Sequence, residues 1–306
     1  MILTNTMNID LNEIKKYSNL SLLAQKTVEG FIAGLHRSPY KGFSVEFAEH
    51  KPYNTGESTK HIDWKLYSRT EKLYHKQFEA ETNLRAYLLL DISSSMYYPQ
   101  ESFGKLLFSS YACACLAYLL NKQRDATGFI GFDESIRYSL QAKTSATHLQ
   151  KIFQTLEIIT SKQNQGQTSL GDVLEEVAIS TPKRSLIILF TDFFEKKEQL
   201  DSLFDSLLHL KHNKNEIIIF HTIDHTTEKD FQFATQSFTF IDIETNEKIK
   251  LRPDQIREEF KKANEENYKE IKLKCGEYNI EFVEVDINDP MDQVLLPYLI
   301  KRQKMR

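Results

Sequence analysis

Hydrophobic residues along this chain of 306 residues follow two spacings, which predict strands and helices in alternation. From Leu84 onward, short apolar runs typical of strands buried on both faces alternate with longer segments whose apolar residues recur at helical spacing. The predicted strands are Leu84–Leu90, Thr127–Phe132, Ile136–Leu140, Leu186–Phe190, Ile217–Thr222 and Ile280–Val285. The predicted helices are Phe103–Asn121, Ala146–Ile159, Leu170–Ser180, Glu198–Lys211, Pro253–Cys275 and Met291–Lys301. This alternation favours an α/β fold with a mostly parallel sheet and helices on both faces.

Two features depart from simple alternation. Ile136–Leu140 follows Thr127–Phe132 so closely that we expect the two strands to pair antiparallel. Phe238–Ile243 and Glu247–Leu251 are predicted to form a hairpin outside the main sheet. The helix that follows, Pro253–Cys275, carries Glu and Lys residues four apart, which indicates a solvated face.

The first part of the chain has a different character. Asn8–Gly34 has the spacing of an amphipathic helix, and Phe43, Val45 and Phe47 alternate with polar residues as in a strand. Ile62–Arg69 and Leu73–Phe78 are predicted to be short ordered pieces. We therefore expect an N-terminal extension over residues 1–82, a helix plus short strands, that packs on a sheet domain over residues 83–306.

Composition and charge exclude several classes of protein. The chain has 39 Lys and Arg against 43 Asp and Glu, a formal net charge of −4, and a nucleic-acid surface needs a basic excess. No apolar run approaches the about 20 residues that span a bilayer. The N-terminus lacks the basic and apolar regions of a signal peptide. We expect a cytoplasmic protein with no membrane span, whose three cysteines are buried thiols.

Glycine is scarce, and its spacing excludes two nucleotide-binding loops. The ten glycines form neither G-x-G-x-x-G nor G-x-x-x-x-G-K-[ST]. Binding of nucleotides by either loop is therefore excluded.

Candidate chemistry gathers where predicted strands end. Asp91, Ser93 and Ser95 form D-x-S-x-S directly after the first buried strand, Asp192 follows the fourth, and Thr168 precedes a helix. Ligands of such sheets bind beyond the carboxyl ends of the strands, so we expect these five side chains to converge. All five are oxygen donors, which hard divalent cations prefer. The sequence therefore predicts a site for Mg²⁺, with Mn²⁺ or Ca²⁺ as alternatives.

Other interpretations of these residues are open. The serines and Thr168 could simply cap helices, and Asp192 could be a turn residue at a strand end. Asp91 could be a phosphate-transferring aspartate, although Ser93 replaces the second acid of the D-x-D of haloacid-dehalogenase-like hydrolases. The G-x-S-x-G of a serine hydrolase is absent.

Two further clusters have a structural and a functional interpretation. His221 and His225 flank Asp224 after another strand, so they are either zinc ligands or ordinary polar residues at a strand end. Asp63, Trp64 and Arg69 form either a docking surface or a hydrogen-bonded staple that fastens the extension to the sheet domain. The staple is the favoured interpretation.

The motifs together resemble a known family. The Asp91–Ser95 motif with Thr168 and Asp192 resembles the metal-ion-dependent adhesion site of von Willebrand factor A domains. Upstream motifs make the chain similar to the bacterial domain-of-unknown-function family 58, over nearly its whole length. These motifs are Gly34–Pro39, Gly42, Val45–Phe47, Tyr53–Glu57, Ile62–Lys65, Ser68–Thr70 and the final Met96 of D-x-S-x-S-M. One departure is Gly56-Glu57-Ser58, where the family usually has Gly-Asp-Asp.

The resemblance implies a von Willebrand factor A-like, Rossmann-like fold, a bound divalent metal, no catalytic activity and a MoxR-type AAA+ ATPase as partner. We therefore expect a non-enzymatic interaction module in a chaperone-like or complex-maturation role. In this module an Asp or Glu of a protein partner completes the shell of the metal. One alternative is a metal-dependent hydrolase that uses the same Asp, Ser and Thr side chains to activate water. Another is a scaffold whose metal site is vestigial.

Overall fold

The computed structural model of the chain forms two compact units, which are described separately here. One comprises Met1–Gly30 with Leu84–Arg306, and the other Phe31–Asn83. The structure describes residues 20–37, 50–52, 67–69, 73–76, 84–99, 104–161, 166, 169–193, 200–233, 238–241 and 248–304. The predicted division into residues 1–82 and 83–306 stays a prediction.

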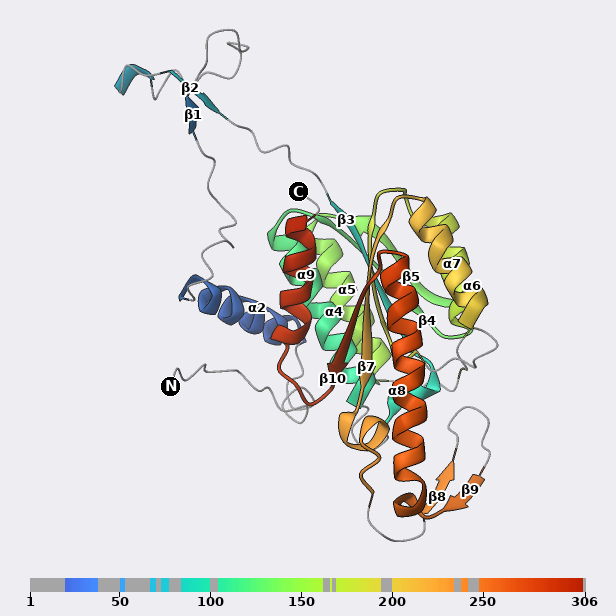
Figure 1. Ribbon diagram of the computed structural model, residues 1–306. Coiled ribbons are helices and arrows are strands. Elements are labelled where there is room, and N and C mark those ends of the chain that lie inside the picture. The colour runs from blue at the N-terminus through green and yellow to red at the C-terminus, as the bar shows by residue number, and fades with distance from the viewer. Residues whose placement is uncertain are drawn as a thin grey trace. The chain divides into compact units, whose positions relative to one another are not determined.

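A six-stranded sheet forms the centre of the larger unit (Figure 1). Its strands are β3 (Arg85–Asp91), β4 (Ala126–Phe132), β5 (Ile136–Lys143), β6 (Leu186–Thr191), β7 (Glu216–Ile223) and β10 (Glu281–Asp286). They lie in the order β10-β7-β6-β3-β4-β5, and every neighbouring pair is parallel except β4 and β5. The predicted mostly parallel sheet and its antiparallel edge pair are confirmed.

Helices cover both faces of this sheet (Figure 1). On one face lie α4 (Gly104–Lys122), α5 (Ala146–Ser161) and α9 (Asp292–Lys304). On the other lie α6 (Leu170–Ser180), α7 (Leu200–His212) and α8 (Pro253–Glu277), which share a hydrophobic core with alternate residues of the strands. Because side chains alternate across a strand, each central strand feeds both cores and is buried throughout.

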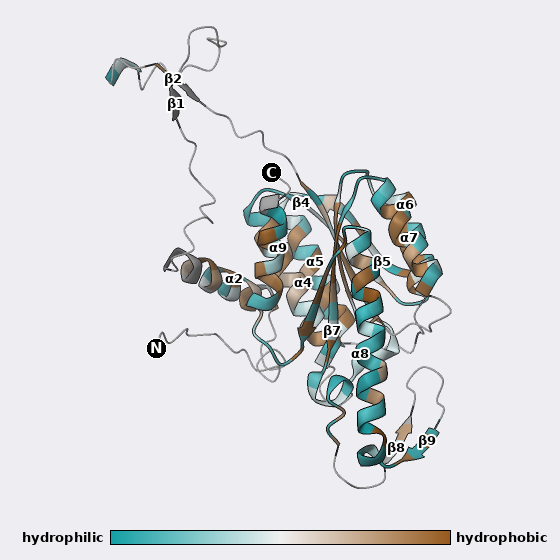
Figure 2. Ribbon diagram, in the orientation of Figure 1, coloured by the Kyte–Doolittle hydropathy of each residue, from teal (hydrophilic) through white to brown (hydrophobic). Residues whose placement is uncertain are grey.

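Two of the helices show how sequence pattern sets burial. The apolar residues of α4 occur all round its axis, and the helix is buried on nearly every side. In contrast, α8 is largely hydrophilic and mostly exposed, as Figure 2 shows by its teal colour. Its Glu270 and Lys274 form one of the expected pairs, with Nζ 3.7 Å from Oε1.

The predicted hairpin is present between β7 and α8. Its strands β8 (Phe238–Ile241) and β9 (Lys248–Leu251) pair antiparallel in a separate two-stranded sheet. Phe231 packs its ring against Phe240 and against Phe260 of α8, with centroids 5.6 and 4.3 Å apart. These aromatic contacts give a two-stranded hairpin the apolar support that it lacks by itself.

The helix α2 (Leu20–Arg37) begins twelve residues later than the predicted start, because residues 8–19 lie outside the described part of the chain. Its Leu23, Ala24 and Val28 are buried. Thr27 also hydrogen-bonds through its hydroxyl to the hydroxyl of Tyr111 in α4. This part of the helix therefore packs on the sheet domain.

In the smaller unit, β1 (His50–Pro52) pairs antiparallel with β2 (Tyr74–Lys76), and Tyr67–Arg69 form a helical turn. The strand expected over residues 43–47 lies outside the described residues.

Two expectations from composition have structural counterparts. Cys113, Cys115 and Cys275 are all buried free thiols. Across the described ranges, no helix combines the length and the apolar character needed to cross a bilayer.

Two glycines give a matched test of packing in the larger unit. At Gly128 in β4 an added Cβ would lie 2.6 Å from the ring of Tyr87, whereas at Gly276 in α8 it would meet nothing within 4 Å. We expect Gly128→Ala to lower the free energy of unfolding by about 2 kcal/mol through overpacking. We expect Gly276→Ala to raise it by about 0.5–1 kcal/mol because alanine favours the helix. Urea denaturation measures both, and equal effects would contradict the described packing.

Candidate functional site

The candidate site lies where the chain changes direction across the sheet. After β3 the chain continues to β4 on one side, and only later does β6 add to the other side of β3. The loops that follow β3 and β6 therefore diverge, and a crevice opens beyond their carboxyl ends, which is where open α/β sheets bind ligands. Asp91 ends β3, and Asp192 directly follows the end of β6.

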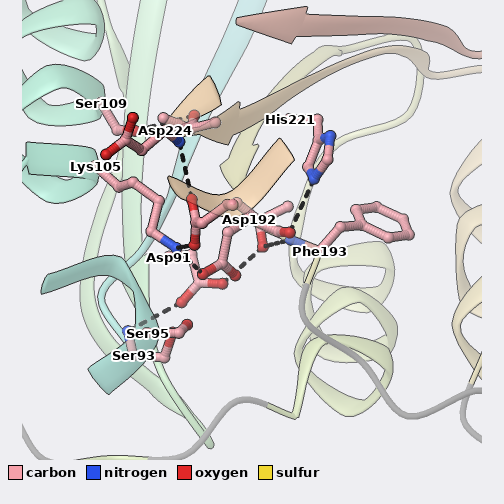
Figure 3. A network of polar contacts seen from close by, with 12 residues as sticks. Asp91, Ser93, Ser95, Lys105, Ser109, Asp192, Phe193, His221 and Asp224 are labelled. Carbon is pink, nitrogen blue, oxygen red and sulfur yellow. Dashed lines mark hydrogen bonds and ion pairs between the residues drawn. The ribbon is translucent and has the colours of Figure 1, made fainter. Parts of the chain in front are cut away.

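Asp91 is completely buried and is held from two sides (Figure 3). Its Oδ1 accepts a hydrogen bond from the backbone N–H of Ser93 at 2.9 Å, and its Oδ2 accepts one from Oγ1 of Thr191 at 2.7 Å. Burial, together with repulsion from Asp192, nevertheless raises the pKa of Asp91 to about 7. Two neighbouring buried acids thus create a local demand for positive charge.

The hydroxyls of the D-x-S-x-S motif divide between two tasks. Ser93 and Ser95 are buried, and their Oγ atoms lie 3.1 Å apart. Ser94 turns elsewhere, and both its backbone N–H and its hydroxyl donate to the carbonyl oxygen of Gly166, at 2.9 and 2.8 Å. The alternation of the motif therefore places the first and third serines together and uses the middle one to hold the neighbouring loop.

Asp192 is fixed through its backbone and its carboxylate. Nε2 of His221 lies 3.0 Å from its carbonyl oxygen, and Nζ of Lys105 donates to its Oδ2 at 2.8 Å. Burial acts to raise the pKa of Asp192, but the Lys105 ammonium and a hydrogen bond from Ser95 outweigh burial and hold that pKa below its usual range. Asp192 is therefore the ionised member of the acid pair.

The backbone next to Asp192 carries strain. Phe193 has a φ of 54°, in the left-handed region, and it is buried. A bulky residue rarely adopts this conformation, at a cost of order 1 kcal/mol, and such strain clusters at functional sites. The backbone N–H of Phe193 donates to Oγ1 of Thr191 at 3.1 Å, which links this turn to the Asp91 hydrogen bond.

Sequence analysis missed two charged members of this network, Lys105 and Glu228. Lys105 lies in the first turn of α4 with only 2% of its side chain exposed, and its Nζ is 2.6 Å from Oε1 of Glu228. Glu228 belongs to the short π-helix His225–Lys229 that follows β7. The one sequence signal was a lysine inside an otherwise apolar helix, since a buried lysine requires a partner.

Thr168 lies outside the described residues, so the structure places four of the five predicted ligands together. Gly166, two residues earlier in the chain, accepts both Ser94 hydrogen bonds. A Cβ at Gly166 would lie 2.7 Å from Oδ2 of Asp133, which follows β4. Glycine at this position therefore permits close packing between the loops that follow β3 and β4.

The two histidines proposed as zinc ligands do not converge. His221 contacts the backbone of Asp192, whereas His225 forms ion pairs with Glu284 at 3.0 Å and Asp286 at 3.5 Å. Asp224 instead caps the π-helix by accepting a hydrogen bond from Thr226 N–H at 3.0 Å. Within the described ranges, no three His, Cys, Asp or Glu side chains gather as a metal-ligand group. The polar strand-end interpretation therefore holds for these residues.

For the upstream cluster, Asp63 and Trp64 lie outside the described residues, and Arg69 is exposed in its helical turn. The choice between staple and docking surface stays a prediction.

The donor set fits a hard divalent cation. Neighbouring ligands of an octahedral Mg²⁺ ion with bonds of about 2.0–2.1 Å stand about 2.8–3.0 Å apart. The 3.1 Å between the hydroxyl oxygens of Ser93 and Ser95 is close to this edge length. Asp91 and Asp192 add buried negative charge beside them, and all described donors are oxygens. The five predicted residues themselves stay a prediction as metal ligands.

Comparison with known proteins adds relatives of low identity. Uncharacterized proteins of Mycobacterium tuberculosis and Mycobacterium bovis are 20% identical over 174 residues, which is 57% of this chain and 55% of each relative. The match thus spans little more than half the length of these relatives.

Among solved structures, the conserved hypothetical protein BatB from Bacteroides thetaiotaomicron is 16% identical, with a TM-score of 0.44 over 73% of this chain and 100% of BatB. An aerotolerance-related membrane protein from Bacteroides fragilis is 17% identical, with a TM-score of 0.44 over 72% of this chain and 99% of that one.

The family itself is shown by a longer match. The model of the family described as protein of unknown function DUF58 matches residues 49–270, which include β3, β6 and the loops that carry the candidate site. Since this match covers more than half of the chain, the protein belongs to the DUF58 family that its sequence motifs resemble.

Proposed function

We propose that this chain is a metal-dependent protein-interaction module with a von Willebrand factor A-like domain. In this proposal Ser93, Ser95 and Thr168 ligate a divalent cation, Mg²⁺ first, through their hydroxyl oxygens. The observation that carries the proposal is the pair of Ser93 and Ser95 hydroxyls 3.1 Å apart, beside two buried carboxylates at the ends of neighbouring parallel strands. Hydroxyl ligands are neutral, so a carboxylate from a partner protein is the natural completion of such a shell.

Asp91 and Asp192 have a supporting role in this proposal. Both oxygens of Asp91 already accept hydrogen bonds, from Ser93 N–H and from Thr191, and Oδ2 of Asp192 accepts one from Lys105. Carboxylates held in this way orient the shell through water molecules and hydroxyls. Their charge makes the site attractive to a cation without supplying all of its ligands.

Thr168 remains in the proposed ligand set because of its place in the chain. Gly166, hydrogen-bonded to Ser94, precedes it by two residues, which span at most about 7 Å. The role of the second serine hydroxyl group of the loop, Ser169, is different, since its Oγ donates to Asp172 of α6 at 2.6 Å.

The partner is proposed from the family resemblance. It is a MoxR-type AAA+ ATPase or a client of that ATPase, and the chain acts in a chaperone-like or complex-maturation role. The hydrolase alternative needs a general base that faces the metal. Burial lowers the pKa of His221 to about 4, and its Nε2 contacts the backbone of Asp192, so this contact does not favour the alternative.

The first prediction concerns the ion. We expect Ser93→Ala to weaken Mg²⁺ binding by at least about tenfold, because one of two adjacent hydroxyl ligands is lost. Isothermal titration calorimetry of both proteins measures the change. Ser110→Ala is the matched control, because the Ser110 hydroxyl is buried in α4 and has no hydrogen-bond partner. Equal Mg²⁺ affinity in Ser93→Ala and wild type would overturn the metal site.

The second prediction concerns the partner. We expect the immobilised chain to capture the MoxR-type ATPase encoded nearest to it when Mg²⁺ is present, to lose it in EDTA, and to regain it when Mg²⁺ is restored. The Ser93→Ala variant should fail in Mg²⁺, and Ser110→Ala should behave as wild type. Quantitative immunoblotting of the eluate measures capture. Capture that EDTA leaves unchanged would support the scaffold alternative instead.

A further inference from the structure

Lys105 occupies a position that is unfavourable for a cation. It is buried in the first turn of α4, where the partial positive charge of the helix N-terminus repels an ammonium group. An apolar residue would pack among the neighbours of this helix without the cost of burying a charge. The position therefore requires an electrostatic reason.

Two carboxylates supply that reason. Figure 3 shows Lys105 reaching from α4 towards Asp192, with Nζ 2.8 Å from Oδ2. The same Nζ lies 2.6 Å from Oε1 of Glu228. Burial by itself would lower the pKa of Lys105, but Asp192 and Glu228 outweigh it and raise that pKa above its ordinary value, so the group is an ammonium ion.

We infer that Lys105 is a built-in counter-cation of the candidate site, which neutralises Asp192 when no metal is present and thereby limits the affinity for a divalent ion. This inference rests on the proposed function and names a regulating residue of the same site. The ammonium and the metal share the charge of Asp192, so each lowers the affinity of the site for the other. Moderate metal affinity also leaves the ion more dependent on a carboxylate from a partner.

Glu228 adjusts this competition. It takes part of the charge of Lys105, and its Oε2 accepts a hydrogen bond from the backbone N–H of Asp224 at 2.8 Å. Glu228 thereby ties the site to the segment that follows β7. Removing its charge leaves the ammonium more fully committed to Asp192.

The test replaces Lys105 with methionine, which keeps the aliphatic stem and removes the charge. A charge within about 4–6 Å changes the proton affinity of a carboxyl group by about 10- to 1000-fold, so we expect Lys105→Met to bind Mg²⁺ at least about tenfold more tightly. Calorimetry measures affinity, and thermal unfolding in EDTA and in Mg²⁺ measures stability. Lys105→Met should melt below wild type in EDTA, and Mg²⁺ should raise its melting temperature more than that of wild type.

Lys122→Met is the matched control. Lys122 ends the same helix, 17 residues and about 25 Å along its axis from Lys105, so its loss should leave Mg²⁺ affinity unchanged. A role of Lys105 in packing alone predicts lower stability that Mg²⁺ does not recover, together with equal or weaker Mg²⁺ binding. Either of those results in a folded Lys105→Met protein overturns the inference.

A second variant decides the question if Lys105→Met does not fold. Glu228 has 30% of its side chain exposed, so Glu228→Gln disturbs the core less, and we expect it to weaken Mg²⁺ binding by about threefold or more. Unchanged or tighter binding by Glu228→Gln then overturns the inference.

The two proposals fail in different ways. Mg²⁺ binding by wild type that Lys105→Met leaves unchanged removes the role of Lys105 and keeps the metal site. Absence of Mg²⁺ binding in wild type and in both variants overturns the metal site and the inference together. Binding by Lys105→Met alone supports the inference and contradicts Mg²⁺ as the ion of the wild-type protein.

Discussion

Two carboxylates buried side by side, Asp91 and Asp192, are the constraint on which the rest of the site depends. A buried carboxylate pair is stable only if hydrogen bonds, a proton or a cation offset the lost hydration and the mutual repulsion. Asp91 receives Ser93 N–H and the hydroxyl of Thr191, and Asp192 receives the ammonium of Lys105. Each of these donors comes from a different element, so the acid pair ties the loops and α4 together.

The sheet makes this concentration of charge possible. Because β6, β3 and β7 are parallel and β6 lies between the other two, their carboxyl ends meet at one edge of the sheet. Asp91, Asp192 and Glu228 come from the segments that follow these strands. The apolar strands bury the base of the site, where charges interact more strongly than in water. The same arrangement leaves the hydroxyls of Ser93 and Ser95 as the neutral donors between charged groups.

Much of this could be predicted from the sequence because it is encoded locally. Runs such as Leu186–Phe190 are apolar at every position, which identified the buried strands, and the alternation of strands and helices indicated a mostly parallel sheet. The place of D-x-S-x-S directly after β3 and of Asp192 directly after β6 then brought the candidate site together at one edge. The upstream motifs, whose family match begins at residue 49, indicated the family.

The sequence by itself determined the elements, the sheet class, the family and the positions of Asp91, Ser93, Ser95 and Asp192 at strand ends. Only the tertiary structure decided which charges pair, because Lys105 lies 87 residues before Asp192 and 123 before Glu228. Periodicity reports whether a position is buried, but it does not report which distant side chain lies 2.8 Å away. The ion pairs of His225 with Glu284 and Asp286 were hidden for the same reason, since β7 and β10 are joined only by register. Local pattern thus set where the candidate site lies, and long-range packing set its charge.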